Sequence, residues 1–144
     1  MESQDVNKIY LLNDITDVFK SIDEIEFAYT FGSFAMLVKG LSKKNFYNDI
    51  DIAIYISEGK KEDFLIFELK MEDKLETLFH IPFDVRILNG APLPFQYNVL
   101  KSGFVILDKN KLLRSDFESL TLKKYFDYVH LRNEYLRETQ NASI

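Results

Sequence analysis

The sequence predicts an α+β domain in which helices and strands alternate and a mixed sheet of about four strands is flanked by helices. Two observations support this fold class. Apolar residues recur at every second position in short runs, as in strands, and at every third or fourth position in longer runs, as in helices. The two kinds of run alternate along the chain, which is typical of a sheet with helices packed on it.

Chain length and composition narrow the class of protein. The 144 residues suit one domain, and 47% hydrophobic with 28% charged residues is ordinary for a globular protein. With no cysteine and two histidines, the chain offers no cysteine-ligated zinc, disulfide framework or histidine-rich metal site. No apolar run could cross a membrane, and the N-terminus lacks a secretory pattern. We therefore expect one domain over residues 1–144 that works in the cytoplasm.

The first elements are a helix, a strand and a short helix. Apolar residues at spacings of three and four predict a helix over 7–22, and alternation of apolar with other residues predicts a strand over 25–31. Gly32 ends this strand. Ser33 is a residue type that favours the N-cap position, so we expect it to cap a helix over 33–38.

The middle of the chain is predicted to contain a loop, the strongest strand and a long helix. Residues 40–48 are polar and predict the loop. Residues 49–56 predict the strand, because isoleucines at alternate positions share one face: Ile50, Ile52, Ile54 and Ile56. After a turn, an apolar stripe predicts a helix over 62–79.

Two short strands and two helices are predicted for the rest of the chain. The strands cover 83–88 and 104–107, and a helix over 92–101 lies between them. The final helix, over 114–139, has two apolar stripes, which is more than one packing face needs. Part of this helix is therefore expected to serve as a surface for a partner.

Two carboxylates stand at the start of the isoleucine strand. Asp49 and Asp51 are two residues apart, so their side chains point to the same face, opposite the isoleucines. Adjacent carboxylates repel one another unless a positive charge lies between them, and Mg²⁺ prefers such oxygen ligands. On this pattern alone, the pair is either a metal site or two solvated carboxylates at a strand end.

Further candidates lie on the neighbouring elements. Gly32 and Ser33 follow the first strand, where backbone amides and a hydroxyl favour a bound phosphate, although a plain turn has the same pattern. Asp84 alternates with core residues of the strand over 83–88, and Arg86 shares its face. Arg86 could neutralise Asp84 or reach a phosphate.

Together these residues resemble those of a known superfamily. A Gly-Ser pair, an Asp-x-Asp on the next strand and one Asp on the following strand resemble the DNA polymerase beta nucleotidyltransferases: Gly32, Ser33, Asp49, Asp51 and Asp84. Within that superfamily the chain is similar to minimal nucleotidyltransferase (MNT) antitoxins, the partners of HEPN-domain toxins. The runs over 85–94, 102–107 and 125–128 also resemble MNT sequences, so the resemblance covers nearly the whole chain.

The resemblance implies Mg²⁺-dependent transfer of AMP from ATP. Asp49 and Asp51 would bind the Mg²⁺ that holds the triphosphate, and Asp84 would complete a second metal site and help to deprotonate the attacking hydroxyl. Gly32 and Ser33 would hold phosphates of the nucleotide. The hydroxyl would belong to a tyrosine of a cognate HEPN ribonuclease toxin, which the transfer would neutralise, and the two proteins would form a hetero-oligomer.

The sequence departs from the MNT pattern in the segment before Asp49. MNT proteins usually have Arg-Gly where this chain has Met36-Leu37, and a shorter segment than the fifteen residues that follow the Gly-Ser pair here. Either Lys39 with its following glycine is the displaced basic pair, or a loop lysine supplies the contact, or the contact is lost. The further candidates for nucleotide binding are therefore Lys39 and Lys43.

Three functions remain open at this point. The first is AMP transfer to a HEPN toxin, the second is a non-catalytic antitoxin that neutralises the toxin by forming a complex, and the third is transfer to a small molecule such as an aminoglycoside. The net charge of −5 argues against direct binding to nucleic acid, since phosphate contacts need a basic surface. We expect ATP and a HEPN toxin as partners, and neither nucleic acid nor a membrane.

Overall fold

The computed structural model describes residues 3–42, 46–57 and 61–142, and the elements in these ranges confirm the predicted alternation. Helices and strands follow one another in the order α1 (Ser3–Lys20), β1 (Ile25–Phe31), α2 (Gly32–Val38), β2 (Ile50–Ile56), α3 (Lys61–Phe79), β3 (Phe83–Ile87), α4 (Leu93–Ser102), β4 (Phe104–Asp108) and α5 (Lys111–Ala142). Within the described ranges, no helix is both long and apolar enough to span a lipid bilayer.

The four strands form one mixed sheet in the order β3-β2-β1-β4. β1 is antiparallel to both of its neighbours, whereas β2 and β3 are parallel. The end of β1 therefore lies beside the starts of β2 and β3, at one edge of the sheet. The predicted mixed sheet is confirmed, and its topology gathers the ends that carry the candidate residues.

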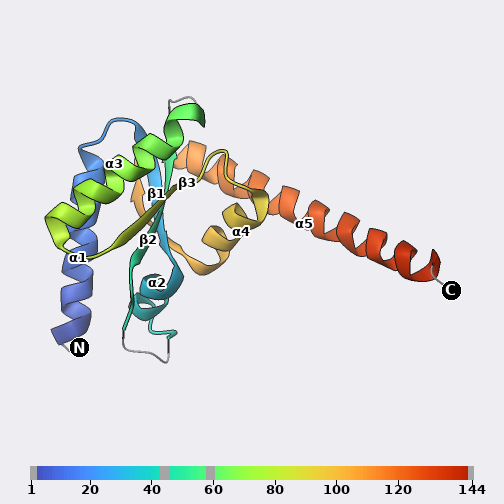
Figure 1. Cartoon of the computed structure of the whole chain (residues 1–144), viewed down its shortest axis with the longest axis horizontal. Coiled ribbons are helices and arrows are strands. Elements are labelled where there is room, and N and C mark those ends of the chain that lie inside the picture. The colour runs from blue at the N-terminus through green and yellow to red at the C-terminus, as the bar shows by residue number, and fades with distance from the viewer. Residues whose placement is uncertain (1–2, 43–45, 58–60, 143–144) are drawn as a thin grey trace.

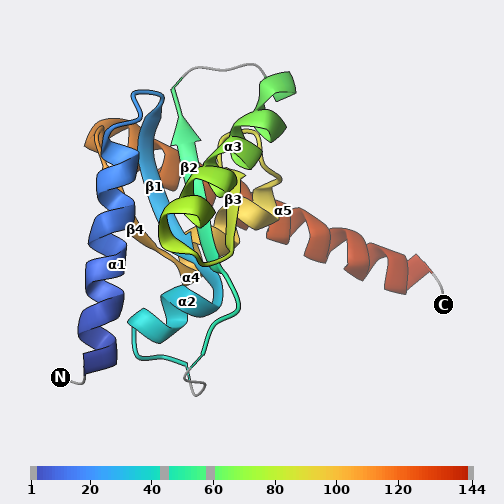
Figure 2. The ribbon, with the colours of Figure 1, turned by 60° about the vertical axis from the view of Figure 1, so that its left-hand side comes forward.

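Helices cover both faces of the sheet, as Figures 1 and 2 show. On one face, α1, α2 and α3 pack against the isoleucines of β2 through buried apolar side chains, among them Ile15, Phe19, Phe34, Met71 and Leu75. On the other face, α4 and the start of α5 pack against β1 through a smaller cluster that includes Phe27, Tyr29, Phe31 and Val99. Strands with apolar residues on both faces fit between these layers.

Glutamates of α3 bind the outward-facing N–H groups of β3, the strand at one lateral side of the sheet. Alternate N–H groups of an edge strand point away from the sheet and would otherwise lack partners within it. Three glutamates of α3, four residues apart and so on one side of the helix, accept these hydrogen bonds. The N–H groups of Phe83, Val85 and Ile87 donate at 3.1, 3.0 and 3.3 Å to the Oε1 atoms of Glu76, Glu72 and Glu68. α3 thereby fixes β3 in place.

The structure corrects several predicted helix starts. α1 begins at Ser3, before the predicted start at residue 7, and ends at Lys20. α2 begins at Gly32 with the extended Phe31 as its N-cap and without a side-chain capping bond, so the prediction that Ser33 caps this helix is wrong. α5 begins at Lys111, before the predicted start at 114. The reason is Asn110, whose Oδ1 accepts the N–H of Leu113 at 3.1 Å and so caps the first turn.

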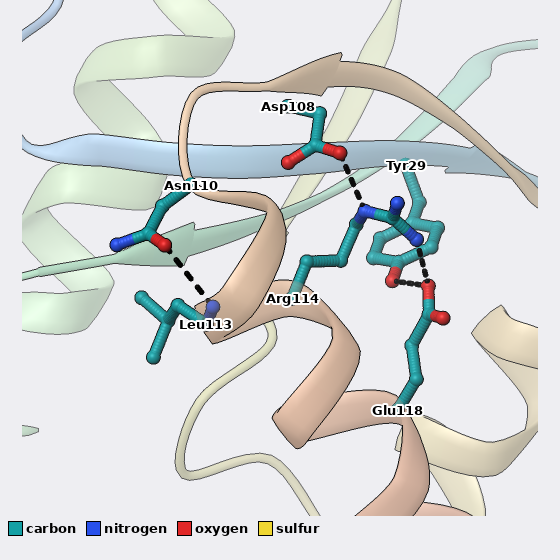
Figure 3. A network of polar contacts seen from close by, with 6 residues as sticks. All are labelled: Tyr29, Asp108, Asn110, Leu113, Arg114 and Glu118. Carbon is teal, nitrogen blue, oxygen red and sulfur yellow. Dashed lines mark hydrogen bonds and ion pairs between the residues drawn. The ribbon is translucent and has the colours of Figure 1, made fainter.

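A polar network fastens the start of α5 to the sheet (Figure 3). Arg114 donates through Nε to Asp108 and through Nη1 to Glu118, each at 2.8 Å. The Tyr29 hydroxyl of β1 donates to the same oxygen of Glu118 at 2.5 Å. Burial, and then the Glu118 carboxylate, raise the pKa of Tyr29, so its hydroxyl keeps the proton that it donates. One arginine thus joins β4, β1 and α5.

We expect Arg114→Met to lower the free energy of unfolding by about 2 kcal/mol, because Asp108 and Glu118 would keep their charges in a half-buried place without a cation. Urea denaturation would measure the change. The matched control is Arg132→Met, an exposed arginine further along α5, which should change stability by no more than about 0.5 kcal/mol. Equal effects of the two variants would show that the network does not hold α5.

Candidate functional site

The strand register brings three aspartates together at one edge of the sheet. Asp51 pairs with Phe31 of β1 on one side and with Asp84 of β3 on the other. Asp49 precedes Asp51 by two residues. Each of the three carboxylates offers an oxygen, and these oxygens all lie within 4.8 Å of one another. All three side chains are half-buried, so the cluster borders solvent while its backbone belongs to the sheet.

Asp51 is the central acid of this cluster. The pKa of Asp51 is raised to about 6, first by burial and then by the negative charges of Asp49 and Asp84, while Arg86 acts to lower it. Its backbone is fixed by Thr30, a fully buried residue whose hydroxyl donates to the Asp51 carbonyl at 3.0 Å. Burial and the two neighbouring carboxylates thus both disfavour the charged form of Asp51.

Arg86 provides part of that compensation. Its Nε donates to Asp84 Oδ1 at 3.0 Å, so of the two roles open from the sequence, the structure gives it neutralisation of Asp84. The pairing with Asp84 raises the pKa of Arg86. The two side chains are 57% and 37% exposed, and an ion pair so close to water contributes little to stability. The contact is therefore one that a stronger cation at Asp84 could replace.

Gly32 stands directly against Asp51. Its φ of +74° favours glycine, and a Cβ at this position would lie 2.1 Å from Asp51 Oδ2. Any other residue would strain the backbone and displace the carboxylate. The neighbouring Ser33 side chain is exposed, and its hydroxyl makes no hydrogen bond within the described ranges. Gly32 thus leaves room for the Asp51 carboxylate to lie against the backbone at the start of α2, where Ser33 presents an exposed hydroxyl.

The lysine candidates are less closely tied to the cluster. Lys39 donates through Nζ to the carbonyl oxygens of Ser102 and Gly103, at 2.8 and 3.1 Å, and lies over the ring of Phe104. These contacts connect the end of α2 to the end of α4. Nucleotide binding by Lys39 stays a prediction, and Lys43 falls outside the described residues.

The donor set fits a hard divalent cation. Carboxylate oxygens are the ligands that such ions prefer, and three of them converge here on a place with uncompensated negative charge. The sequence pointed to all three of the aspartates that converge here, and their role as metal ligands stays a prediction. It gave no sign of Thr30, a polar residue in an otherwise apolar strand. Sequence reasoning also missed the glutamates over β3, although their four-residue spacing marks one side of α3.

Comparison with solved structures gives the fold a known counterpart. A chain in the structure of tri-AMPylated Shewanella oneidensis HEPN toxin with MNT antitoxin is 19% identical, with a TM-score of 0.68 over 92% of this chain and 98% of that one. A chain of a toxin–antitoxin crystal structure with AMP-PNP is 22% identical, with a TM-score of 0.58 over 96% and 98%. A chain of an MntA–HepT crystal structure is 20% identical, with a TM-score of 0.55 over 99% and 100%. At these identities the likeness establishes a shared fold.

Comparison of the sequence itself identifies the family. No curated protein sequence matches the chain. Residues 13–112, well over half of the chain, match the family model described as polymerase beta, nucleotidyltransferase. The matched range runs from α1 to the start of α5 and includes the aspartate cluster with Gly32 and Ser33. The chain therefore belongs to the polymerase beta nucleotidyltransferase family.

Proposed function

We propose that this protein is an antitoxin that transfers AMP from ATP to a hydroxyl group of a partner toxin, with Mg²⁺ held by Asp49, Asp51 and Asp84. The observation that carries the proposal is the convergence of these three carboxylates beside Gly32, the first residue of α2. Nucleotidyl transfer needs metal ligands beside a place for the triphosphate. The carboxylates would supply the ligands, and the backbone N–H groups at the start of α2 would supply contacts to the phosphates. ATP and Mg²⁺ are available in the cytoplasm, where we place the activity.

Each residue of the cluster has a task in this reaction. Asp49, Asp51 and Asp84 would hold Mg²⁺, which would supply charge neutralisation for the transfer. Gly32 and Ser33 would hold the outer phosphates of the nucleotide. The acceptor oxygen forms a bond to the α-phosphorus, the bond from that phosphorus to the bridging oxygen breaks, and pyrophosphate leaves. Asp84 accepts the proton of the acceptor hydroxyl. The remaining contribution of the chain is positioning.

The solved relatives support a HEPN toxin as acceptor. One of them contains a HEPN toxin that carries three AMP groups and is bound to an MNT antitoxin, and another contains AMP-PNP. Their chains are aligned with this one over nearly their full length. We therefore infer a HEPN toxin as the partner and a tyrosine hydroxyl as the acceptor.

The outer part of α5 is the surface that we assign to this partner. Its first turns pack on the body, whereas the rest extends away from it in both views (Figures 1 and 2). Several large apolar side chains on this part are exposed: Phe126, Leu131, Tyr135 and Leu136. Exposed apolar side chains of this size on a projecting helix suit burial against another protein. The segment over 114–139 is thus proposed to bind the toxin.

A second candidate is neutralisation by binding alone. Lys39 is occupied with carbonyl oxygens, and Met36-Leu37 provide no cation near Ser33, which favours weak contacts to a triphosphate. The exposed face of α5 would serve such a binding module equally well. The experiments below separate the two candidates, because only the enzyme depends on the aspartates.

In an incubation with labelled ATP, Mg²⁺ and the toxin, we expect Asp49→Asn with Asp51→Asn to reduce label on the toxin by at least about a hundredfold, because the metal loses two ligands. Radiolabel or intact-protein mass spectrometry measures the transfer. Asp73→Asn, the same change at an exposed position of α3, is the matched control and should label normally. If the wild-type protein leaves the toxin unlabelled but neutralises it in cells, and the double variant also neutralises it, binding alone is the function.

In the metal-free protein, we expect Asp51→Asn to raise the free energy of unfolding at pH 7.5 by about 1 kcal/mol. The pKa of Asp51 lies above its ordinary value, so the folded state binds its proton more tightly than the unfolded state does. The stability that this proton provides is lost as the pH rises from about 4 to 6. Urea denaturation should therefore show the gain at pH 7.5 and almost none at pH 4.

At pH 7.5, Mg²⁺ should reduce or reverse the difference in free energy of unfolding between Asp51→Asn and the wild type. The reason is that Mg²⁺ binds the wild-type cluster more tightly than the variant. A variant that is equally stable at both pH values, with and without Mg²⁺, would contradict the electrostatic account of the cluster.

For the partner surface, we expect Leu131→Asp and Tyr135→Asp each to weaken binding of the toxin at least about tenfold, because a charge would enter a buried apolar contact. These side chains are 64% and 68% exposed in the isolated chain, so the melting temperature should hardly change. Titration calorimetry measures the affinity. Asn13→Asp, which places a charge on an exposed part of α1, is the control. Normal affinity in both test variants would place the toxin elsewhere.

A further inference from the structure

A preformed pocket lies beside β3, and its wall includes Arg86, which contacts Asp84 of the aspartate cluster. It has a volume of about 340 Å³ and opens between α3 and the start of α4. Apolar groups make up most of its wall, with one cation and one carboxylate: Phe64, Glu68, Arg86, Ile87, Gly90, Ala91, Pro92 and Phe95. A space of this size and character suits a ring or a small apolar group more than a phosphate chain.

Contacts with neighbouring elements hold the walls of the pocket in place. Phe95 packs edge-on against Phe31, with ring centres 5.5 Å apart, and Phe31 directly precedes Gly32. Glu68 accepts a hydrogen bond from the N–H of Ile87, which fixes the spacing between α3 and β3. Pro92 is the N-cap of α4. A site with walls fixed in this way needs little rearrangement to receive a ligand.

Arg86 links the pocket to the cluster. It lines the pocket and donates to Asp84 at 3.0 Å. Because β2 lies between β1 and β3, Asp51 separates this side of the site from Gly32. The site therefore has two sides: Gly32 after the end of β1, and the apolar pocket lined by Arg86 of β3.

In-line transfer distinguishes these two sides. The attacking oxygen and the leaving pyrophosphate lie on opposite sides of the α-phosphorus. With the outer phosphates over Gly32, the attacking hydroxyl must approach from the side of β3, where Asp84 can accept its proton. The pocket is on that side, so its occupant belongs to the acceptor.

We propose that the pocket holds the phenol ring of the acceptor tyrosine and thereby selects an aromatic hydroxyl. The proposal rests on the proposed function, which it extends to the class of acceptor side chain. Phe64, Pro92 and Phe95 provide apolar walls for the ring, and the ring's hydroxyl points past Arg86 toward Asp84. The phenol oxygen then forms the bond to the α-phosphorus as pyrophosphate leaves, and its proton passes to Asp84.

The test fills the pocket without changing the cluster. Ala91→Trp should raise the KM for the toxin at least about tenfold and leave the KM for ATP within about twofold of the wild-type value. Ala91→Leu fills less of the space and should give an intermediate value, which guards against a tryptophan variant that does not fold. Ile66→Trp is the matched control, since Ile66 is 54% exposed on α3 and does not line this pocket.

A second measurement needs no catalysis. N-acetyl-L-tyrosinamide, added to the metal-free protein, should shift the amide NMR signals of Ala91 and Phe95, and Ala91→Trp should abolish these shifts. N-acetyl-L-leucinamide, which has no ring, is the control probe and should produce much smaller shifts.

The outcomes distinguish a failure of the pocket assignment from a failure of the proposed function. If the wild-type protein labels the toxin but the KM for the toxin is unchanged in Ala91→Trp and Ala91→Leu, the pocket is not the acceptor site and the proposed function stands. A rise in the KM for ATP alone would assign the pocket to the adenine ring and overturn the proposal. If no protein is labelled, the proposed function fails, and the tyrosinamide shifts alone support or overturn a phenol-binding pocket.

Discussion

The register of β2 against its two neighbours is the constraint on which the site depends. It places Asp51 between Phe31 and Asp84, so the end of one strand and the starts of two others converge. A slip of one residue would turn Asp51 into the core and expose Ile52. The isoleucine face of β2 therefore secures the position of the carboxylates, because every shifted register would remove buried apolar area from the core.

The cluster that this register creates is unfavourable by itself. Asp51 lies against the backbone of Gly32, and its pKa is raised by burial and by the two other acids nearby. Among the described residues, the positive charge beside the cluster comes from a solvent-exposed arginine that pairs with Asp84. Sites that hold repelling charges in this way are typical of places that a ligand completes.

Residue periodicity predicted the elements well, because both of its periods come from local backbone geometry. The shared face of Asp49 and Asp51 followed from the same argument. Periodicity gives no information on strand order. The proximity of Asp84 to Asp51 could therefore be predicted only from the family resemblance. Two further differences have other causes. The extended Phe31 took the cap position expected for Ser33. Lys39 binds carbonyl oxygens at the end of α4, in a segment sixty residues away in the chain, and local sequence patterns carry no information on such a contact.

α4 connects the two surfaces that the proposals assign to the partner. Its first turn supplies Pro92 and Phe95 to the pocket beside Asp84. One turn later, Tyr97 stacks on Tyr125 of α5, with ring centres 3.7 Å apart and planes within 5° of parallel. A protein bound along the outer part of α5 would therefore rest on the helix that also forms a wall of the pocket. Because Arg114 fixes the start of α5 to the sheet, such a partner would be held at a set position relative to the aspartates.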